Sequence, residues 1–239
     1  MIKIFPILCR AGTMDNYAYL LTDEKSQISA IIDPSEVAPI QKFCETQNIK
    51  PKYVLNTHHH FDHTDGNLAL KNLYNVQIVG HSKDAHRIPG IDICLQEGDY
   101  FQLGESQAQI ISVDGHTIGH ILYYFANSQT LFTGDMLFNL CIGGIFEGTA
   151  EQMWQSIQKI KALPEETRFY PGHEYTRYGA NEALYFSQNS EDVKKYLEQA
   201  QTHLQQGLPT GPYTLKEEKQ CNPYLTATDF NEFVHRLNS

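Results

Sequence analysis

The chain has 239 residues, of which 41% are hydrophobic and 19% charged, and its formal net charge is -10 at pH 7. This composition is typical of a globular protein that buries a core of its own, and it excludes an intrinsically disordered chain. The negative charge argues against a nucleic acid as substrate and an anionic membrane as partner, because both repel an acidic protein.

The first two thirds of the chain alternate between strand and helix patterns. Short apolar or β-branched runs bounded by turn residues predict strands at 2–8, 17–21, 28–32, 53–55, 76–80, 108–113, 121–125 and 130–133. Helical spacing of apolar residues predicts helices at 36–48, 64–74 and 150–162. The alternation indicates a mixed α/β fold.

The composition changes from about residue 175 onward. Residues 178–206 and 228–237 are rich in Glu, Gln and Lys and are predicted to be helical, with the segment Gly207–Pro212 between them. We therefore expect two units, residues 1–174 and a small helical unit at 175–239.

A cluster of histidines follows the strand predicted at 53–55. Residues 57–63 have the sequence THHHFDH, which places four imidazoles and a carboxylate within seven positions. These groups suit zinc and related divalent ions, and His58 and His60 share one face if the strand conformation persists. Asp62 and His63 come after the turn and can serve a second ion.

Three further candidates occur at the ends of predicted strands beside a glycine. His116 lies in the sequence GHTIGH, Asp135 in TGD, and His173 in PGHE. Glycine allows the backbone to approach a metal centre closely. A surface histidine tract that binds metal adventitiously would not need these matching positions.

Four motifs carry a resemblance to a known family. They are HxHxDH at 58–63, GHTxGH at 115–120, TGD at 133–135 and PGHEYT at 171–176, and the segments at 15–17, 146–149 and 222–225 add to them. In this order they resemble the metallo-β-lactamase superfamily, and specifically its glyoxalase II family, over almost the whole chain. The resemblance implies an α/β fold, the four-layer αβ/βα sandwich, with a small C-terminal helical unit. It also implies that 1–174 is catalytic and that 175–239 binds substrate.

The resemblance also implies a dinuclear metal site. The residues implied are His58, His60 and His116 for the first ion, Asp62, His63 and His173 for the second, and Asp135 as the bridge. Asp62 and Asp135 are the implied catalytic residues, and a hydroxide held by the ions is the implied nucleophile. Two divalent cations are expected, with zinc first, although the same ligands accept iron or manganese.

Other polar residues near these motifs are expected to support the ligands. Thr57, Asp33 and Asp65 are candidates to hold the second nitrogen of a ligand imidazole, and Asp33 is equally suited to the turn before Pro34. His59 should point away from the ions, because its neighbours at 58 and 60 point in. His120 is expected to support the loop. Surface or core positions without ligands are expected for His81, His86, His203 and His235.

The implied reaction is hydrolysis of S-D-lactoylglutathione to D-lactate and glutathione, a step in methylglyoxal detoxification. A thiolate leaves readily, so the attack of hydroxide needs no separate general acid. The alternatives are hydrolysis of another acyl thioester or a lactone, a persulfide dioxygenase with one iron, and a non-enzymatic metal store or sensor. A small-molecule thioester is therefore the expected partner, and we expect a monomer.

The implied substrate contacts are Gly144, Ile145, Phe146 and Tyr175. The sequence departs from the family where basic residues usually hold glutathione, because Gly144, Val234 and Leu237 occupy those positions. This departure predicts weak binding of glutathione, unless other cations replace the missing ones. The candidates for replacement are Arg10, Arg177 and Arg236.

The remaining features concern location and redox state. No apolar run approaches the roughly 20 residues that span a bilayer, and the start of the chain lacks an export signal, so a cytoplasmic location is expected. The five cysteines are widely spaced without a CxxC pair. Reduced, mostly buried thiols are expected from this pattern.

Overall fold

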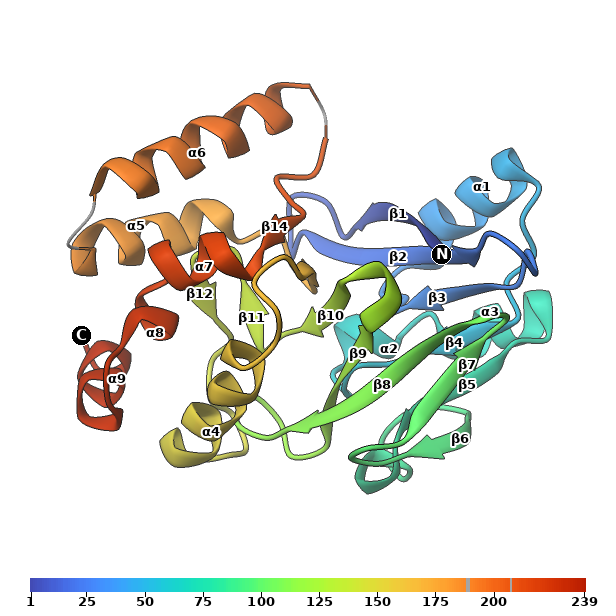
Figure 1. The fold of residues 1–239 in the computed structure, drawn as a ribbon. Helices are drawn as coiled ribbons and strands as arrows, with labels where there is room; N and C mark the ends of the chain where they lie inside the picture. Colours follow the sequence, from blue (N-terminus) through green and yellow to red (C-terminus); the bar gives the residue numbers. More distant parts are fainter. Residues whose placement is uncertain (188–189, 207) are drawn as a thin grey trace.

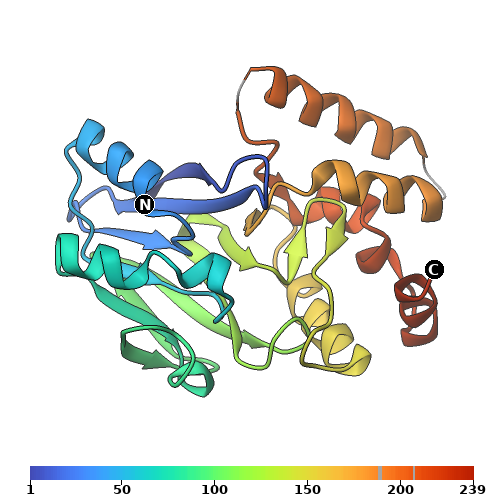
Figure 2. The same cartoon turned by 180° about the vertical axis from the view of Figure 1, so that it is seen from behind.

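Two β-sheets packed face to face form the centre of the molecule (Figure 1). The computed structural model describes residues 1–187, 190–206 and 208–239. Helices cover the outer face of each sheet, and Figure 2 shows the early helices on one side and the late helices on the other. The protein therefore has the four-layer α/β sandwich, with a helical C-terminal part, that the motifs imply.

The first sheet contains the N-terminal strands in sequence order. Its strands are β1 (Ile2–Cys9), β2 (Asn16–Asp23), β3 (Ser29–Ile32), β4 (Tyr53–Leu55), β5 (Gln77–His81) and β6 (Ile91–Leu95). The pairs from β1 to β3 are antiparallel, and those from β3 to β6 are parallel. Parallel strands need crossover connections, which α1 (Val37–Gln47) supplies between β3 and β4 and α3 (Asn67–Tyr74) between β4 and β5.

The second sheet has the order β14-β13-β10-β9-β8-β7. Its strands are β7 (Tyr100–Leu103), β8 (Ser106–Val113), β9 (His120–Phe125), β10 (Thr130–Gly134), β13 (Arg168–Pro171) and β14 (Tyr213–Thr214). A separate hairpin joins β11 (Leu137–Phe138) to β12 (Cys141–Ile142), and α4 (Ala150–Lys161) packs on the outer face of the sheet. Strand β14 comes from the C-terminal part of the chain, which therefore pairs with the second sheet.

Strand β2 shows how the layers arise from sequence. Its side chains alternate between the two faces, and all eight residues are buried. Tyr19 and Leu21 face the second sheet, together with Phe132 and Tyr123 from that sheet. Ala18 and Leu20 belong to the core under α1 and α3 instead. A strand buried on both faces gives a continuous apolar run, as this sequence does.

Several strands of the fold are absent from the predicted strand ranges: the short strands β11 to β14, and also β6 and β7. The last two have a common cause. Each is an edge strand of its sheet. Their burial alternates along only four or five residues. Such short, half-exposed segments lack the continuous apolar run that identifies the central strands.

The single helix predicted at 178–206 is wrong. The structure has α5 (Thr176–Phe186) and α6 (Ser190–Gln205), which pack against each other (Figure 1). Helix α5 ends at Ser187, whose backbone is extended, and residues 188–189 lie outside the described part. The sequence has no glycine or proline between residues 180 and 206, so helix propensity alone does not reveal the break.

The last part of the chain forms α7 (Leu215–Cys221), α8 (Pro223–Thr226) and α9 (Phe230–Leu237). A buried carboxylate fixes these helices to the rest of the molecule, because Glu218 accepts hydrogen bonds from the Leu140 amide, the Tyr196 hydroxyl and the Asn222 amide. Burial raises the pKa of Glu218 to about 7, although these hydrogen bonds act in the opposite direction. Trp154 of α4 contacts Phe233 of α9, with ring centroids 5.2 Å apart.

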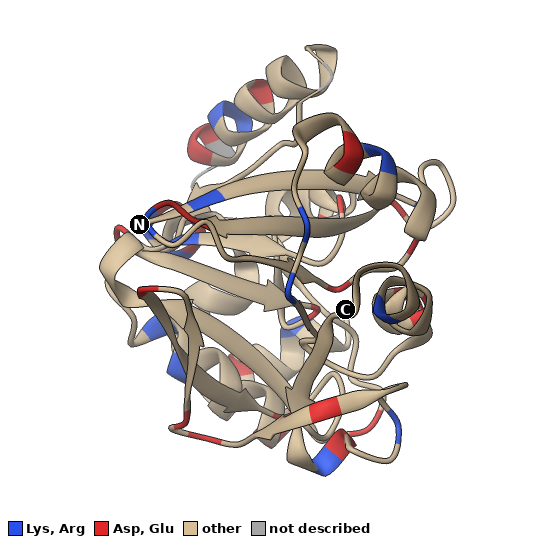
Figure 3. Ribbon diagram, turned by 90° about the vertical axis from the view of Figure 1, so that its right-hand side faces the viewer, with Lys and Arg blue, Asp and Glu red and all other residues tan. Residues whose placement is uncertain are grey.

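The surface charges, the helix lengths and the cysteines can be compared with what the composition predicts. Lysines and arginines are scattered among aspartates and glutamates in the view of Figure 3. Within the described residues, no helix is both long enough and apolar enough to cross a bilayer. All five cysteines are unpaired and four of them are buried, as the sequence predicts.

Candidate metal centre and adjoining cavity

The seven predicted ligand side chains converge at one edge of the sandwich, and they arrive there from both sheets. Residues 58–63 follow β4 of the first sheet, and the short helix α2 (Phe61–Thr64) carries Asp62 and His63. The other ligands follow strands of the second sheet: His116 lies between β8 and β9, Asp135 after β10, and His173 after β13.

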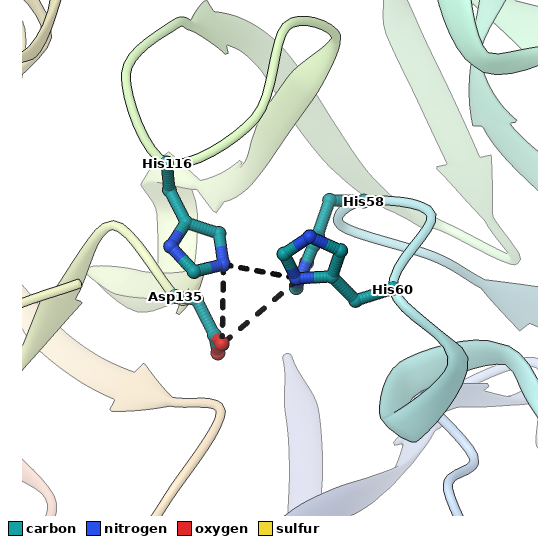
Figure 4. Close-up of side chains that lie close together, drawn as sticks. All are labelled: His58, His60, His116 and Asp135. Carbon is teal, nitrogen blue, oxygen red and sulfur yellow. Dashed lines mark hydrogen bonds and ion pairs between the residues drawn. The ribbon is translucent and has the colours of Figure 1, made fainter. Parts of the chain in front are cut away.

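Four of these residues form the first group, which is composed of His58, His60, His116 and Asp135. Figure 4 shows the three imidazoles and the carboxylate directed at a common point. The His116 Nε2 atom lies 3.1 Å from His60 Nδ1 and 3.5 Å from Asp135 Oδ2. Ligand atoms around a tetrahedral zinc ion, with bonds of about 2.1 Å, lie about 3.4 Å apart. The spacing therefore fits a bound ion.

The second group shares the Asp135 carboxylate with the first. It contains Asp62, His63 and His173, whose ligand atoms lie within 4.8 Å of one another. The His173 Nε2 atom is 3.3 Å from both Asp62 Oδ2 and Asp135 Oδ2, and His63 Nε2 is 3.3 Å from Asp135 Oδ1. Asp135 therefore reaches both groups, as expected for a bridging carboxylate.

Two buried polar atoms in this cluster have no hydrogen-bond partner, His58 Nε2 and Asp135 Oδ1. Buried polar groups are almost always paired, so each such atom needs an explanation. Both atoms face the other ligands of the cluster, where a cation would satisfy them. The donor set of imidazoles and carboxylates together with these two atoms fits a divalent metal ion.

The charges of the cluster shift the pKa values in opposite directions. Burial, and then the neighbouring imidazole of His63, hold the pKa of His58 well below its usual value. Burial also favours neutral His173, but Asp135 and Asp62 outweigh it and raise the pKa of His173 to about 9. Burial favours neutral Asp135, but His63 and His173 hold its pKa well below the usual range. The carboxylates thus create a site that favours positive charge.

The second nitrogen of several ligand imidazoles is held by a neighbouring group. Thr57 Oγ1 lies 3.0 Å from His58 Nδ1, and Asp33 Oδ2 lies 3.2 Å from His63 Nδ1. Such contacts fix the orientation of a ligand and tune its basicity. Thr57 and Asp33 therefore have the supporting positions that the sequence predicts, and Asp33 also has the turn conformation, with a φ of 47°.

Asp65 does not hold a ligand, contrary to expectation. Its side chain is 49% exposed and pairs with Arg10. The residue caps the C-terminal end of α2, where its side chain is exposed, whereas His63 is buried although only one residue separates them in sequence. Sequence proximity to the cluster was therefore misleading.

Backbone carbonyls support two further imidazoles of the cluster, and the sequence could not reveal these contacts. The Gly144 carbonyl lies 2.8 Å from His116 Nδ1, and the Met14 carbonyl lies 2.8 Å from His173 Nδ1. Asn16 is a further missed residue, because its side-chain amide donates to the carboxylate of Asp62 at 3.0 Å. Its place in the DNY segment at 15–17 was the only sequence signal.

The other histidines stay outside both groups. His59 lies 3.3 Å from Asp84 and 3.4 Å from Glu147, which confirms that it points away. His120 stacks on His58 and its Nε2 accepts the backbone N–H of Asp135, so it supports the loop as predicted. None of His81, His86, His203 and His235 belongs to a metal-binding group of the described residues.

Glycines allow the close approach that was predicted beside the ligands. A Cβ at Gly172 would lie 2.3 Å from Asp135 Oδ1, and one at Gly143 would lie 1.8 Å from the Asp135 carbonyl oxygen. Both distances are far below any real contact. Any side chain at these positions would displace the Asp135 loop.

A cavity of about 680 Å³ adjoins the metal cluster. Its walls come from β11, β12 and the loop after them, and from α5, α8 and α9. Tyr175 and Phe138 form the boundary with the cluster, since Tyr175 stacks on His173 at 4.6 Å and contacts Phe138 at 5.2 Å. The cavity therefore lies directly beside the second metal-binding group.

Three of the four expected substrate contacts line this cavity: Gly144, Ile145 and Tyr175. Phe146 is 71% exposed, and its ring lies edge-on to His116 and His60. Burial, and then Asp135 and Asp62, raise the pKa of Tyr175 to about 12, so its hydroxyl remains a hydrogen-bond donor at neutral pH.

The basic residues that were candidates to hold glutathione do not line the cavity. Arg10 pairs with Asp65, and Arg236 donates to Pro223, Thr226 and Glu232. Arg177 is exposed and also lies outside the lining. By contrast, Val234 and Leu237 do line it, so these two departures from the family pattern fall within the cavity.

Sequence reasoning missed one charged residue of the cavity wall, Glu182. The signal was present, because Tyr175, Tyr178 and Glu182 follow the spacing of three and four residues that defines one helix face.

Comparisons with known proteins cover the whole of this architecture. Residues 11–173 match the model of the metallo-beta-lactamase superfamily, and residues 174–237 match the model described as hydroxyacylglutathione hydrolase C-terminus. The chain is 46% identical to a hydroxyacylglutathione hydrolase of Pelagibacter ubique, over 88% of each chain. It is 41% identical to one of Methylococcus capsulatus, over 88% of this chain and 82% of that protein.

Solved structures share the fold at lower identity. The crystal structure of ETHE1 from Myxococcus xanthus superposes with a TM-score of 0.76 at 24% identity, over 99% of this chain and 90% of that one. The BLEG-1 B3 metallo-beta-lactamase gives 0.70 at 24% identity, over 95% of this chain and 100% of that one.

Proposed function

The chain belongs to the hydroxyacylglutathione hydrolases of the metallo-β-lactamase superfamily and hydrolyses glutathione thioesters, and we propose that its substrate is S-D-lactoylglutathione, cleaved to D-lactate and glutathione. The observation that carries this proposal is the convergence of seven imidazole and carboxylate side chains beside a cavity that can take an organic thiol. Removal of methylglyoxal as a thioester of glutathione is the process that this reaction would serve.

We propose that the cluster holds two divalent ions, with zinc as the resident metal. The proposed ligands are His58, His60 and His116 for one ion, Asp62, His63 and His173 for the other, and Asp135 for both. When bound, such a pair lowers the pKa of a coordinated water toward neutrality and stabilises the negative charge that develops on the carbonyl oxygen. Iron or manganese would suit the same ligands, so metal analysis decides the identity.

The protein's own residues orient the reaction. Asp62 and Asp135 supply negative charge between the two histidine groups, and Asn16 keeps the Asp62 carboxylate in place. Tyr175 offers a protonated hydroxyl at the boundary between cluster and cavity. Because the thiolate is a good leaving group, the cavity wall needs no proton donor for it.

Two ligand substitutions test the proposal. We expect Asp135→Ala and His58→Ala each to abolish hydrolysis of lactoylglutathione and to lower the metal content below two ions per chain, because each removes a proposed ligand. His59→Ala is the matched control, since His59 pairs with Asp84 and Glu147 outside the cluster, and it should keep both ions. Full activity of either ligand variant with two metals retained would contradict the assignment.

The same experiments separate the alternatives. One iron per chain and no thioester hydrolysis would favour a persulfide dioxygenase. Turnover of other acyl thioesters or lactones in preference to lactoylglutathione would change the proposed substrate.

We also propose that the protein is cytoplasmic and monomeric. The five cysteines, none of which forms a disulfide, support a reducing compartment. Light scattering in solution tests the monomer.

A further inference from the structure

The cavity beside the metal cluster has an unusual distribution of charge. Its lining is otherwise neutral, being aliphatic, aromatic, glycine, thiol or amide, and Glu182 is the one carboxylate, with no lysine, arginine or histidine, among the described lining residues. The lining residues at this end of the chain are Val234 and Leu237 of α9 and Asn238, which caps that helix. An anionic ligand entering this cavity meets a negative charge and no positive one.

Glu182 is held in place by tyrosines of the cavity wall. The Tyr224 hydroxyl donates to Glu182 Oε2 at 3.0 Å, and Tyr178 also interacts with Glu182, whose charge raises the pKa of Tyr178. No lysine, arginine or histidine forms an ion pair with Glu182 in the part of the chain that the structure describes. A half-buried carboxylate that is positioned without a cation partner is suited to receive a cation from a ligand.

The position of Glu182 along α5 suits one end of an extended ligand. Tyr175, Tyr178 and Glu182 follow one helix face, and Tyr175 stacks on His173 at the metal cluster. Glu182 is seven positions after Tyr175, which caps the start of α5, and seven helical steps correspond to roughly 10 Å along the axis. In glutathione the ammonium group of the γ-glutamyl residue is eight bonds from the sulfur, roughly 9 Å when extended.

We propose that Glu182 binds the ammonium group of the thiol half of the substrate. The cavity then recognises glutathione by its single positive charge, and the tyrosine rings beside Glu182 add favourable contacts to a cation. This inference rests on the proposed hydrolysis of a glutathione thioester. It predicts that removal of the ammonium charge weakens binding, whereas removal of the carboxylate charges does not.

Substrates that differ in one charged group test this assignment. The metal-loaded protein is assayed with lactoylglutathione, with its N-acetylated form, and with its diethyl ester. We expect N-acetylation to raise KM about tenfold, the lower end of the range for a charged hydrogen bond because Glu182 is partly exposed. Esterification should change KM less than threefold, and kcat should change little in either case, because the contact is the same in the ground and transition states.

The variant Glu182→Gln keeps the shape of the side chain and an oxygen that accepts from Tyr224. We expect it to raise KM for lactoylglutathione about tenfold and to abolish the discrimination against the N-acetylated substrate. Glu198→Gln, which removes an exposed charge from α6, is the matched control and should leave both KM values unchanged. Equal KM values for the two substrates in the wild type, or retained discrimination in Glu182→Gln, would overturn the inference.

Binding of the product makes the result independent of turnover. Calorimetric titration with glutathione and with N-acetylglutathione should give a Kd about tenfold higher for the acetylated form, and the difference should vanish in Glu182→Gln. A wild type that binds glutathione with this pattern but does not hydrolyse lactoylglutathione would refute the proposed reaction and support the ammonium site. A wild type that hydrolyses lactoylglutathione but binds glutathione and N-acetylglutathione equally well would support the proposed reaction and refute the ammonium site.

Discussion

Replacement of Asp33 by asparagine separates two roles that this residue combines. The carboxylate accepts from the backbone N–H of Thr57 at 2.8 Å and from its hydroxyl at 2.6 Å, and it lies 3.2 Å from His63 Nδ1. Its backbone is in the left-handed region, with a φ of 47°. Asparagine adopts this conformation readily, so Asp33→Asn preserves the turn before Pro34 and alters only the carboxylate.

The expected effect is on the affinity for metal. The asparagine amide offers one acceptor oxygen where the carboxylate offers two, so the His63 Nδ1–H or a Thr57 donor loses its partner in a buried site. Removal of such a support typically lowers metal affinity 10- to 100-fold, and His63 also loses a neighbouring negative charge. We therefore expect Asp33→Asn to lose the ion bound by His63 about tenfold more readily than the wild type.

Competition with a chelator, followed by metal analysis, measures this change. Asp65→Asn is the control, because Asp65 was an equal candidate from the sequence but pairs with Arg10 at the surface. It should bind metal like the wild type. Unchanged affinity in Asp33→Asn, or an equal loss in Asp65→Asn, would refute the supporting role derived from the geometry.

Three further predictions follow from the cavity and from the C-terminal helices. Gly143→Ala should lower thermal stability and metal content, because its Cβ would lie 1.8 Å from the carbonyl oxygen of Asp135, whereas Gly144→Ala should be neutral. The triple variant Gly144→Lys, Val234→Arg and Leu237→Lys introduces three cations into the cavity wall. It should lower KM for lactoylglutathione at least tenfold, with kcat nearly unchanged. An unaltered KM would show that glutathione does not approach this wall. Burial raises the folded pKa of Glu218 to about 7 from 4.5, so its ionisation opposes folding, and the free energy of unfolding should fall as the pH rises between these values. Denaturant titrations at several pH values measure this fall. In Glu218→Gln the free energy of unfolding should fall less over this pH range than in the wild type, and an equal fall would contradict the effect assigned to Glu218.

The central elements and the ligand set could be predicted because both have strong local signals. Strand β2 is buried on both faces and gives a continuous apolar run, and the proposed ligands follow strands β4, β8, β10 and β13, in the turns and the short helix α2 after them. The edge strands and the end of α5 at Ser187 lack such signals. In these segments, contacts with residues that are distant in sequence decide the structure, and the local sequence pattern does not reveal those contacts.

The environment of the ligands was only partly predictable for the same reason. Thr57 is next to His58 in sequence, so its supporting role could be guessed. The carbonyls of Met14 and Gly144 carry no residue-type signal, and they come from distant segments of the chain. Asp65 was misplaced because its side chain is exposed at the end of α2, where it pairs with Arg10.

The metal-binding groups and the cavity wall are encoded by largely different parts of the chain. All the proposed ligands lie between residues 58 and 173, whereas most of the cavity wall comes from the segment 138–145 and from helices after residue 175. Mutations in α5 or α9 can therefore change which thiol is recognised while the hydrolytic centre stays intact. Divergence of substrate choice among homologues should accumulate in these helices, and the centre they serve should change far more slowly.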